Sequence, residues 1–134
     1  MDWLLEQQER AQDSPEGIGS VSLTAQGASI ATTPIPMPAL TEGLYRVSVY
    51  ARITRAGSVS SSLIVTIGHT DGAIACTQVT TALTTNTTAS TRVAEYVVRS
   101  DASVAISYAT TYADGGGATS MQYSLYIVVE AMPS

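Results

Sequence analysis

The sequence contains no lysine and no phenylalanine, and it has only one cysteine, one histidine and one tryptophan. Six arginines, spread along the chain, face 11 acidic residues, so there is no basic stripe that could neutralise nucleic-acid phosphates. The same charge balance disfavours anionic membrane surfaces, and no apolar run approaches the roughly 20 residues that span a bilayer. We therefore expect neither a nucleic-acid partner nor a membrane partner.

The single cysteine, Cys76, excludes both an intramolecular disulfide and a cysteine-based metal site. Its neighbours are typical of a strand, where a free cysteine acts as a small buried hydrophobe. The first residues carry acid where a secretory signal carries base, so we expect synthesis in a reducing cytoplasm rather than export. We expect no cofactor and no metal.

His69 is the only histidine, so a Ser-His-Asp triad would have to use it. Asp71 could orient its ring, but no nucleophile elbow accompanies the pair, and the sequence around them is typical of a turn. The other carboxylates are too scattered to nominate a glycosidase pair. The sequence predicts a protein that is not an enzyme.

The 134 residues suit one domain, and their apolar share comes from small and β-branched side chains alternating with Ser and Thr. The strongest alternation covers 44–54, where Tyr45, Val47, Val49, Ala51 and Ile53 share one face, which we assign to the core. Weaker strand patterns lie near 20–25, 28–33, 63–67, 73–82, 92–99, 104–108 and 121–129. About eight short strands predict an all-β fold, a two-sheet antiparallel sandwich of jelly-roll type.

Between these strands the sequence predicts three irregular segments. His69-Thr70-Asp71-Gly72 has the composition of a turn. The Thr-rich tract at 80–88 is either a long loop or an irregular edge, and the triple glycine at 115–117 predicts a flexible tip.

Residues 2–12 are good helix formers that follow the possible cap Asp2, and 13–17 break the helix. We therefore divide the chain into an N-terminal helical arm with its linker, 1–18, and a β-sandwich domain, 19–134. Trp3, Leu4 and Leu5 cluster at one end of the arm and need a surface to bury them. The arm is either an anchor on a neighbouring molecule, a terminus without structure, or a helix docked on its own domain.

Apolar residues also occur on nominally outer faces of two strands, namely Tyr96 and Val98, and Tyr126 and Val128. They predict an additional buried surface, for which contact between subunits is the economical explanation. Alternatively, Tyr50, Tyr96, Tyr112 and Tyr126 could bind sugars, although tyrosine also serves as a filler of cores and interfaces.

Three segments give the chain a resemblance to small β-sandwich virion proteins of tailed bacteriophages: 42–50 (EGLYRVSVY), 67–72 (IGHTDG) and 123–130 (YSLYIVVE). The resemblance implies a repeated virion protein, often a homotrimer, whose terminal arm fastens it to the major capsid protein or to tail proteins. Our leading hypothesis is a capsid decoration (cement) protein that self-associates and docks on the particle. The alternative is a carbohydrate- or receptor-binding module of a tail fibre or baseplate, using loops 70–72, 84–90 and 112–118.

Overall fold

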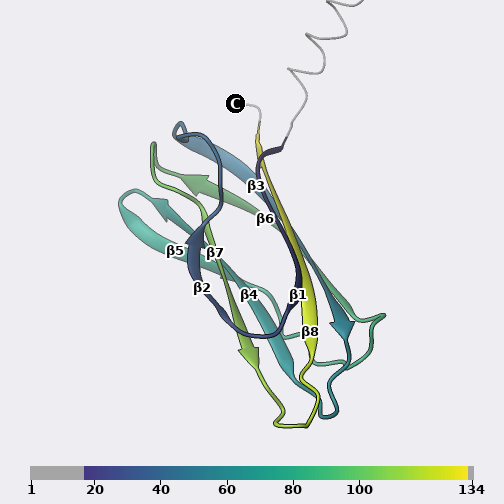
Figure 1. Ribbon diagram of the computed structural model, residues 1–134. Coiled ribbons are helices and arrows are strands. Elements are labelled where there is room, and N and C mark those ends of the chain that lie inside the picture. The colour runs from purple at the N-terminus through teal and green to yellow at the C-terminus, as the bar shows by residue number, and fades with distance from the viewer. Residues whose placement is uncertain (1–16, 133–134) are drawn as a thin grey trace, which may run out of the picture.

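The computed structural model describes residues 17–132, which form two four-stranded β-sheets packed face to face (Figure 1). The described part of the chain contains no helix, and the helix expected at 2–12 lies outside it. The strands are β1 (Gly17–Gln26), β2 (Ile30–Pro34), β3 (Gly43–Arg55), β4 (Ser62–Asp71), β5 (Ile74–Val79), β6 (Thr91–Ser100), β7 (Ser107–Ala113) and β8 (Gln122–Ala131). The expected all-β sandwich of about eight strands is confirmed.

The strands are ordered β1-β8-β3-β6 in sheet A and β2-β7-β4-β5 in sheet B, and all neighbours are antiparallel. Only β4 and β5 are consecutive strands of one sheet, so every other connection crosses from one sheet to the other. This interleaved order is the arrangement of a jelly roll.

The core lies between the sheets and is built from the alternate residues of each strand that point inward. Tyr45, Val47, Val49, Ala51 and Ile53 of β3 are all buried, as their alternation predicts. They meet buried residues of the neighbouring and opposite strands, among them Leu63, Val65, Ile67, Leu125, Ile127 and Val129. The period of two in the sequence therefore selects the core face of β3 correctly.

One polar link crosses this core. Tyr123 of β8 is fully buried, and its hydroxyl donates to the Ala28 carbonyl at 2.7 Å. The same hydroxyl lies 2.7 Å from the Thr110 hydroxyl of β7, which in turn accepts from the Ile30 amide at 2.8 Å. These bonds satisfy the buried hydroxyls and tie sheet A to sheet B.

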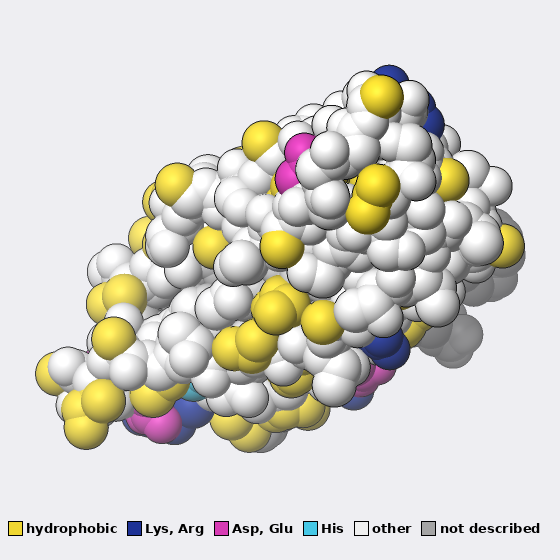
Figure 2. Space-filling view, turned by 90° about the horizontal axis from the view of Figure 1, so that it is seen from below, with side chains coloured by type: hydrophobic (Ala, Val, Ile, Leu, Met, Phe, Trp, Pro, Cys, Tyr) yellow, Lys and Arg dark blue, Asp and Glu magenta, His cyan; other side chains and the backbone are white. Residues whose placement is uncertain are grey.

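The loops gather at the two ends of the sandwich. Loops 27–29, 56–61, 80–90 and 114–121 share one end, here called the loop end. The other connections lie at the opposite end, together with the first and last described residues (Figure 1). Viewed from below, the loop end bears few charged side chains, and its hydrophobic side chains lie in separate groups (Figure 2).

The loop end is tied together by hydrogen bonds. The Asn86 side chain bonds both the amide and the carbonyl of Gly57 at 2.8 Å, and the Ser58 amide donates to the Thr119 carbonyl at 2.9 Å. A Cβ atom placed on Gly115 would lie 2.2 Å from the Ser60 carbonyl oxygen. The glycines at 115–117 do lie in a loop, as expected, and two of them, Gly115 and Gly117, allow loop 114–121 to pack closely on loop 56–61.

The turn expected over residues 69–72 lies further along the chain, and of these four residues only Gly72 belongs to it. Strand β4 continues to Asp71, and the reversal is made by Gly72 and Ala73, which both have positive φ angles. His69 is a buried strand residue whose ring faces inward. In the Thr-rich tract, Thr80 and Leu83 bond β4, so its first part is an irregular edge and the rest is loop.

Candidate functional site

The outer face of sheet A carries most of the large apolar side chains that the fold leaves exposed. Strands β3, β6 and β8 place them there because alternate residues of each strand point away from the core. They are Leu44, Tyr50, Val93, Val97, Tyr126 and Val128, with exposed fractions between 38% and 68%. We call this set the apolar face of sheet A, and it is the candidate functional site.

Strand register brings these residues into neighbouring positions. Tyr50 is paired with Tyr126 on one side and with Val93 on the other, so the three form a row across the strands. The two tyrosine rings are tilted by 45°, with their centroids 6.2 Å apart. Val128 is paired with Ser48 in the next row. The apolar side chains therefore run from β8 across β3 to the edge strand β6.

Two charged side chains on this face form an ion pair with each other. Arg46 Nε lies 2.9 Å from Glu95 Oε1 on the neighbouring strand. Both side chains remain partly exposed, so the pair contributes little to stability. Its effect is to neutralise the surface around the apolar side chains, which suits a face that contacts another protein.

The structure separates the four residues that the sequence suggested as an interface. Tyr126 and Val128 do face outward from β8. Tyr96 and Val98 face inward, because they are paired with the core residues Val47 and Tyr45, so their assignment to an outer face is wrong. Burial also raises the pKa of the Tyr96 hydroxyl.

The outward residues of β6 are instead Val93 and Val97, which the sequence reasoning missed. Strand β6 is apolar on both faces, so alternation alone could not separate its two sides. Charge does not separate the two sides either, because Glu95 lies on the outer face whereas Arg92, paired with the core residue Ala51, lies on the inner one.

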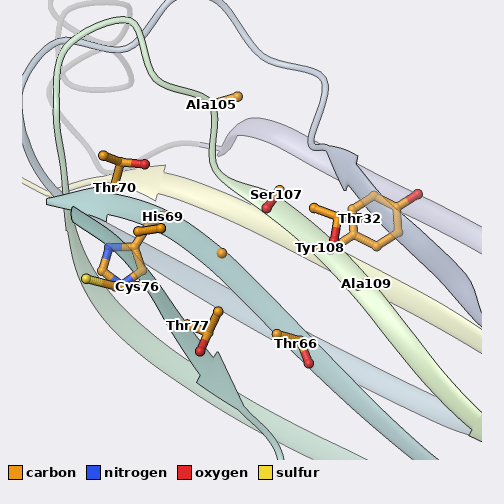
Figure 3. Close-up of a pocket in the computed structure, with 12 residues that line it drawn as sticks. Thr32, Thr66, His69, Thr70, Cys76, Thr77, Ala105, Ser107, Tyr108 and Ala109 are labelled. Atoms are coloured by element: carbon orange, nitrogen blue, oxygen red, sulfur yellow. The ribbon is translucent and has the colours of Figure 1, made fainter. Parts of the chain in front are cut away.

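The outer face of sheet B differs in chemistry. It holds an open depression of about 240 Å³ at Gly68, whose neighbours on β7 and β5 are Ser107 and Thr77. Threonine and serine side chains from four strands surround it, and the buried His69 ring lies beside Cys76 (Figure 3). Hydroxyls are available here, but the exposed tyrosine pair that could stack on a sugar lies on sheet A.

The three loops suggested for sugar binding do not form one site. Loops 84–90 and 112–118 lie at the loop end, whereas 70–72 lies at the other end of β4. Strand β4 has 10 residues, which separates its ends by about 30 Å. Of the tyrosines suggested for that role, Tyr112 also faces inward and packs against Tyr123 at a centroid distance of 6.2 Å.

At the end opposite the loop end, a charged cluster fixes the β4–β5 turn. The Arg99 guanidinium contacts Glu42 and lies 2.7 Å from Asp71, and these carboxylates raise its pKa. Asp101 accepts from the Ala73 and Gly72 amides at 2.7 and 2.9 Å, which lowers the pKa of its carboxyl. The cluster therefore has a structural role: it holds the β4–β5 turn of sheet B in place.

His69 and Asp71 do not form the pair that a catalytic triad would need. The ring Nδ1 lies 2.9 Å from the Arg99 carbonyl oxygen, so it is the protonated nitrogen and donates that bond. The Asp71 carboxylate is taken by Arg99. Within residues 17–132, no three His, Cys, Asp or Glu side chains gather in a way that could hold a metal ion.

Comparison with known proteins gives a likeness of fold. No family model and no curated protein matches the sequence. Among solved structures, the VP2 subviral particle of infectious bursal disease virus matches 89% of this chain with 15% identity and a TM-score of 0.51. A carbohydrate-binding module from Cellvibrio mixtus lichenase 5A, in complex with cellotriose, covers 92% of this chain and 95% of its own, with 15% identity and a TM-score of 0.35.

The chain spans about a third of the length of the viral chain, 33%. At 15% identity the likeness shows the β-sandwich fold alone. None of the described residues belongs to a helix long and apolar enough to cross a membrane. Trp3, Leu4 and Leu5 lie outside the described residues, and their role in docking stays a prediction.

Proposed function

We propose that this chain is a non-enzymatic structural protein of a tailed-phage particle, a capsid decoration protein that docks through the apolar face of sheet A. The observation that carries the proposal is that sheet A exposes six large apolar side chains on its outer face, in addition to the inner face that builds the core. Its partners are the major capsid protein or tail proteins and other copies of itself, and it is incorporated into virions after synthesis in the host cytoplasm.

The architecture supports this role because jelly rolls serve as building blocks of viral shells. The physical mechanism is burial of the outward valines and tyrosines, at about 25 cal/mol for each square ångström removed from water. Much of that gain offsets the entropy lost on association, so a single contact is weak. Repetition over many linked copies makes the attachment stable.

The test is co-sedimentation of the purified chain with particles assembled without it. Tyr126→Asp places a charge in the middle of the apolar face, and Thr66→Asp places the same charge on the outer face of sheet B. We expect the wild-type chain and Thr66→Asp to sediment with the particles and Tyr126→Asp to remain in solution. Equal binding of both variants would show that another surface docks, and absence of binding by the wild-type chain would contradict the virion role.

The arm is tested separately. Trp3→Ala combined with Leu4→Ala removes the apolar end of the arm without altering the described sandwich. If the arm anchors the protein on a neighbour, this double variant should bind particles more weakly than the wild-type chain. Unchanged binding would leave the apolar face of sheet A as the sole docking surface.

The second candidate, a glycan-binding module, rests on the exposed Tyr50 and Tyr126 pair. A glycan array probed with the wild-type chain and with Tyr126→Ala tests it. Binding that disappears in the variant would favour this function over particle docking, and an array without hits would remove it.

A further inference from the structure

The four edge strands of the sandwich differ in how they are protected from pairing with another strand. Strand β1 has register shifts near both of its ends, β2 is five residues long and ends at Pro34, and β5 has six residues. Strand β6 is paired with β3 over ten consecutive positions without a shift, and it contains no proline, glycine or lysine. Bulges, prolines and lysines are the features that normally block edge pairing, so β6 is the unprotected edge.

Contacts around the end of β6 show which of its backbone groups point away from β3. The Arg99 carbonyl accepts from the His69 ring, and the Asp101 amide donates to the Thr70 carbonyl, both across to sheet B. Leu44, the partner of Arg99 on β3, accepts from the Met132 amide on its opposite side. The pair of Leu44 and Arg99 is therefore one that does not exchange backbone hydrogen bonds.

Alternation along the strand extends this result. Backbone N–H and C=O groups point to the same side at every second residue of a strand. Counting back from Arg99, the groups that also point outward from the edge belong to Thr91, Val93, Glu95 and Val97. In the described part of the chain these groups have no hydrogen-bond partner. Val93 and Val97 are also among the most exposed apolar side chains, at 68% and 55%.

We propose that β6 pairs antiparallel with β6 of a second copy of this chain, about a two-fold axis at Ala94. The four residues with unpaired outward backbone groups span 91–97, and Ala94 is the centre of this segment. An axis at Ala94 therefore lets all four bond the other copy: Thr91 pairs with Val97, and Val93 pairs with Glu95. The two A sheets then join into one continuous sheet of eight strands. This inference specifies how copies of the proposed decoration protein contact one another. It rests on the proposed function only for the expectation that the chain self-associates.

Charge favours this register over its neighbour. Moving the axis by one residue, to Glu95, would place the two Glu95 side chains directly opposite each other, which is unfavourable across a strand pair. With the axis at Ala94, Glu95 lies opposite Val93, and its carboxylate keeps the Arg46 guanidinium of its own copy at 2.9 Å. The edge is therefore complementary to a second copy of itself. A strand that placed an acidic residue opposite Glu95 would fit it less well.

The first test is the solution mass of the full chain, measured by light scattering after size exclusion. Val93→Pro removes an outward-pointing N–H and leaves the ladder to β3 intact, while Val93→Thr keeps that donor and the β-branched shape. We expect dimers for the wild-type chain and Val93→Thr, and a dissociation constant roughly thirtyfold higher for Val93→Pro, since each dimer loses two donors. Circular dichroism checks that Val93→Pro remains folded.

The second test fixes the register by disulfide formation in a Cys76→Ser background. Ala94→Cys places the two thiols at a site where the Cα atoms are about 4.5 Å apart, within the range of a disulfide. Val97→Cys is the matched control, because it lies opposite Thr91 and about 20 Å from its own counterpart. We expect rapid cross-linking of Ala94→Cys and none of Val97→Cys.

A monomer, a trimer as the family resemblance implies, a dimer unaffected by Val93→Pro, or cross-linking at 97 instead of 94 would overturn this pairing. Capture of an extended segment of another protein by β6 would give a hetero-complex without a homodimer and would also overturn it. Particle binding by a monomeric wild-type chain would contradict the pairing and leave the decoration role standing. A dimer that does not bind particles would contradict the decoration role and leave the pairing of β6 standing.

Discussion

In sheet A, β3 is paired with both of its neighbours along nearly its whole length, through ten register pairs with β6 and ten with β8. In sheet B, the longest ladder, between β4 and β7, has seven pairs, and side chains add further links to sheet A and to loops. Sheet A is held by its ladders and by the core, so its outer surface is free for contact. Sheet B has shorter ladders, and polar contacts such as the one between the Thr110 and Tyr123 hydroxyls tie it to sheet A.

The largest expected effect concerns the two faces of β8 in sheet A. Val129 is fully buried, while its neighbour Val128 is 39% exposed. Val129→Ala should lower the free energy of unfolding by about 2–3 kcal/mol, because it removes buried methyl groups and leaves a cavity. Val128→Ala should change it by less than about 1 kcal/mol, measured by urea denaturation. Equal losses would mean that the outer face also stabilises the isolated chain.

A second effect concerns the joint between the sheets at the loop end. Gly115→Ala would force a Cβ atom against the Ser60 carbonyl, whereas a Cβ atom on Gly43 would meet nothing within 4 Å. We expect Gly115→Ala to cost about 1–3 kcal/mol in thermal or urea unfolding, and Gly43→Ala to be nearly neutral. Full stability of Gly115→Ala would show that loop 114–121 does not depend on this close packing.

A third effect concerns the polar link between the sheets. Tyr123→Phe leaves the Ala28 carbonyl and the Thr110 hydroxyl without their partner, which should cost about 1–2 kcal/mol. Tyr126→Phe, on the outer face of the same strand, is the matched control and should cost almost nothing. Urea denaturation of the two variants at neutral pH separates these outcomes.

The link also predicts a dependence on pH. Burial raises the pKa of the Tyr123 hydroxyl in the folded protein. The folded state therefore keeps this proton after the unfolded chain begins to lose it near pH 10, and the free energy of unfolding falls as the pH rises further. Tyr123→Phe should make this alkaline loss less steep, and an unchanged slope would assign it to other groups, among them Tyr96.

The smallest effect is local to the β4–β5 turn of sheet B. The Ala73 and Gly72 amides lower the pKa of Asp101, so its stabilising contribution is complete above about pH 4 and is lost as the pH falls through the lower folded value. Asp101→Ala should speed hydrogen exchange at these two amides at neutral pH, while Asp101→Asn keeps one acceptor and should have a smaller effect. Unchanged exchange in Asp101→Ala would show that Arg99 and Asp71 suffice to hold the turn.

The sequence predicted the parts of the fold in which alternation is strong and one-sided. The core face of β3 follows from a polar residue at nearly every second position, and the predicted range 44–54 lies within one residue of Gly43–Arg55 at each end. Strand β6 lacks that contrast, so its two faces were confused. The turn at His69 was placed too early because Asp-Gly is a strong turn signal, whereas the ladder with β5 extends β4 to Asp71.

The candidate site was only partly accessible from sequence for the same reason. Tyr126 and Val128 were identified because β8 has a clear inner face, but Val93 and Val97 became visible only through their pairing with Tyr50 and Arg46. The unpaired backbone groups of β6 leave no trace in composition at all. They depend on strand order, which decides which strand ends a sheet.

Gly17 is paired with Glu130, so the polypeptide enters and leaves the sandwich at adjacent points. Joining residue 132 to residue 17 through a short linker and reopening the chain within 84–88 would give a circular permutant that retains the ladders of both sheets. A cargo fused directly at residue 17 or residue 132 would emerge at the end away from the loop end, and one fused to the ends of the permutant would emerge from the loop end itself. The same jelly roll could thus display a fused protein in either of two opposite directions.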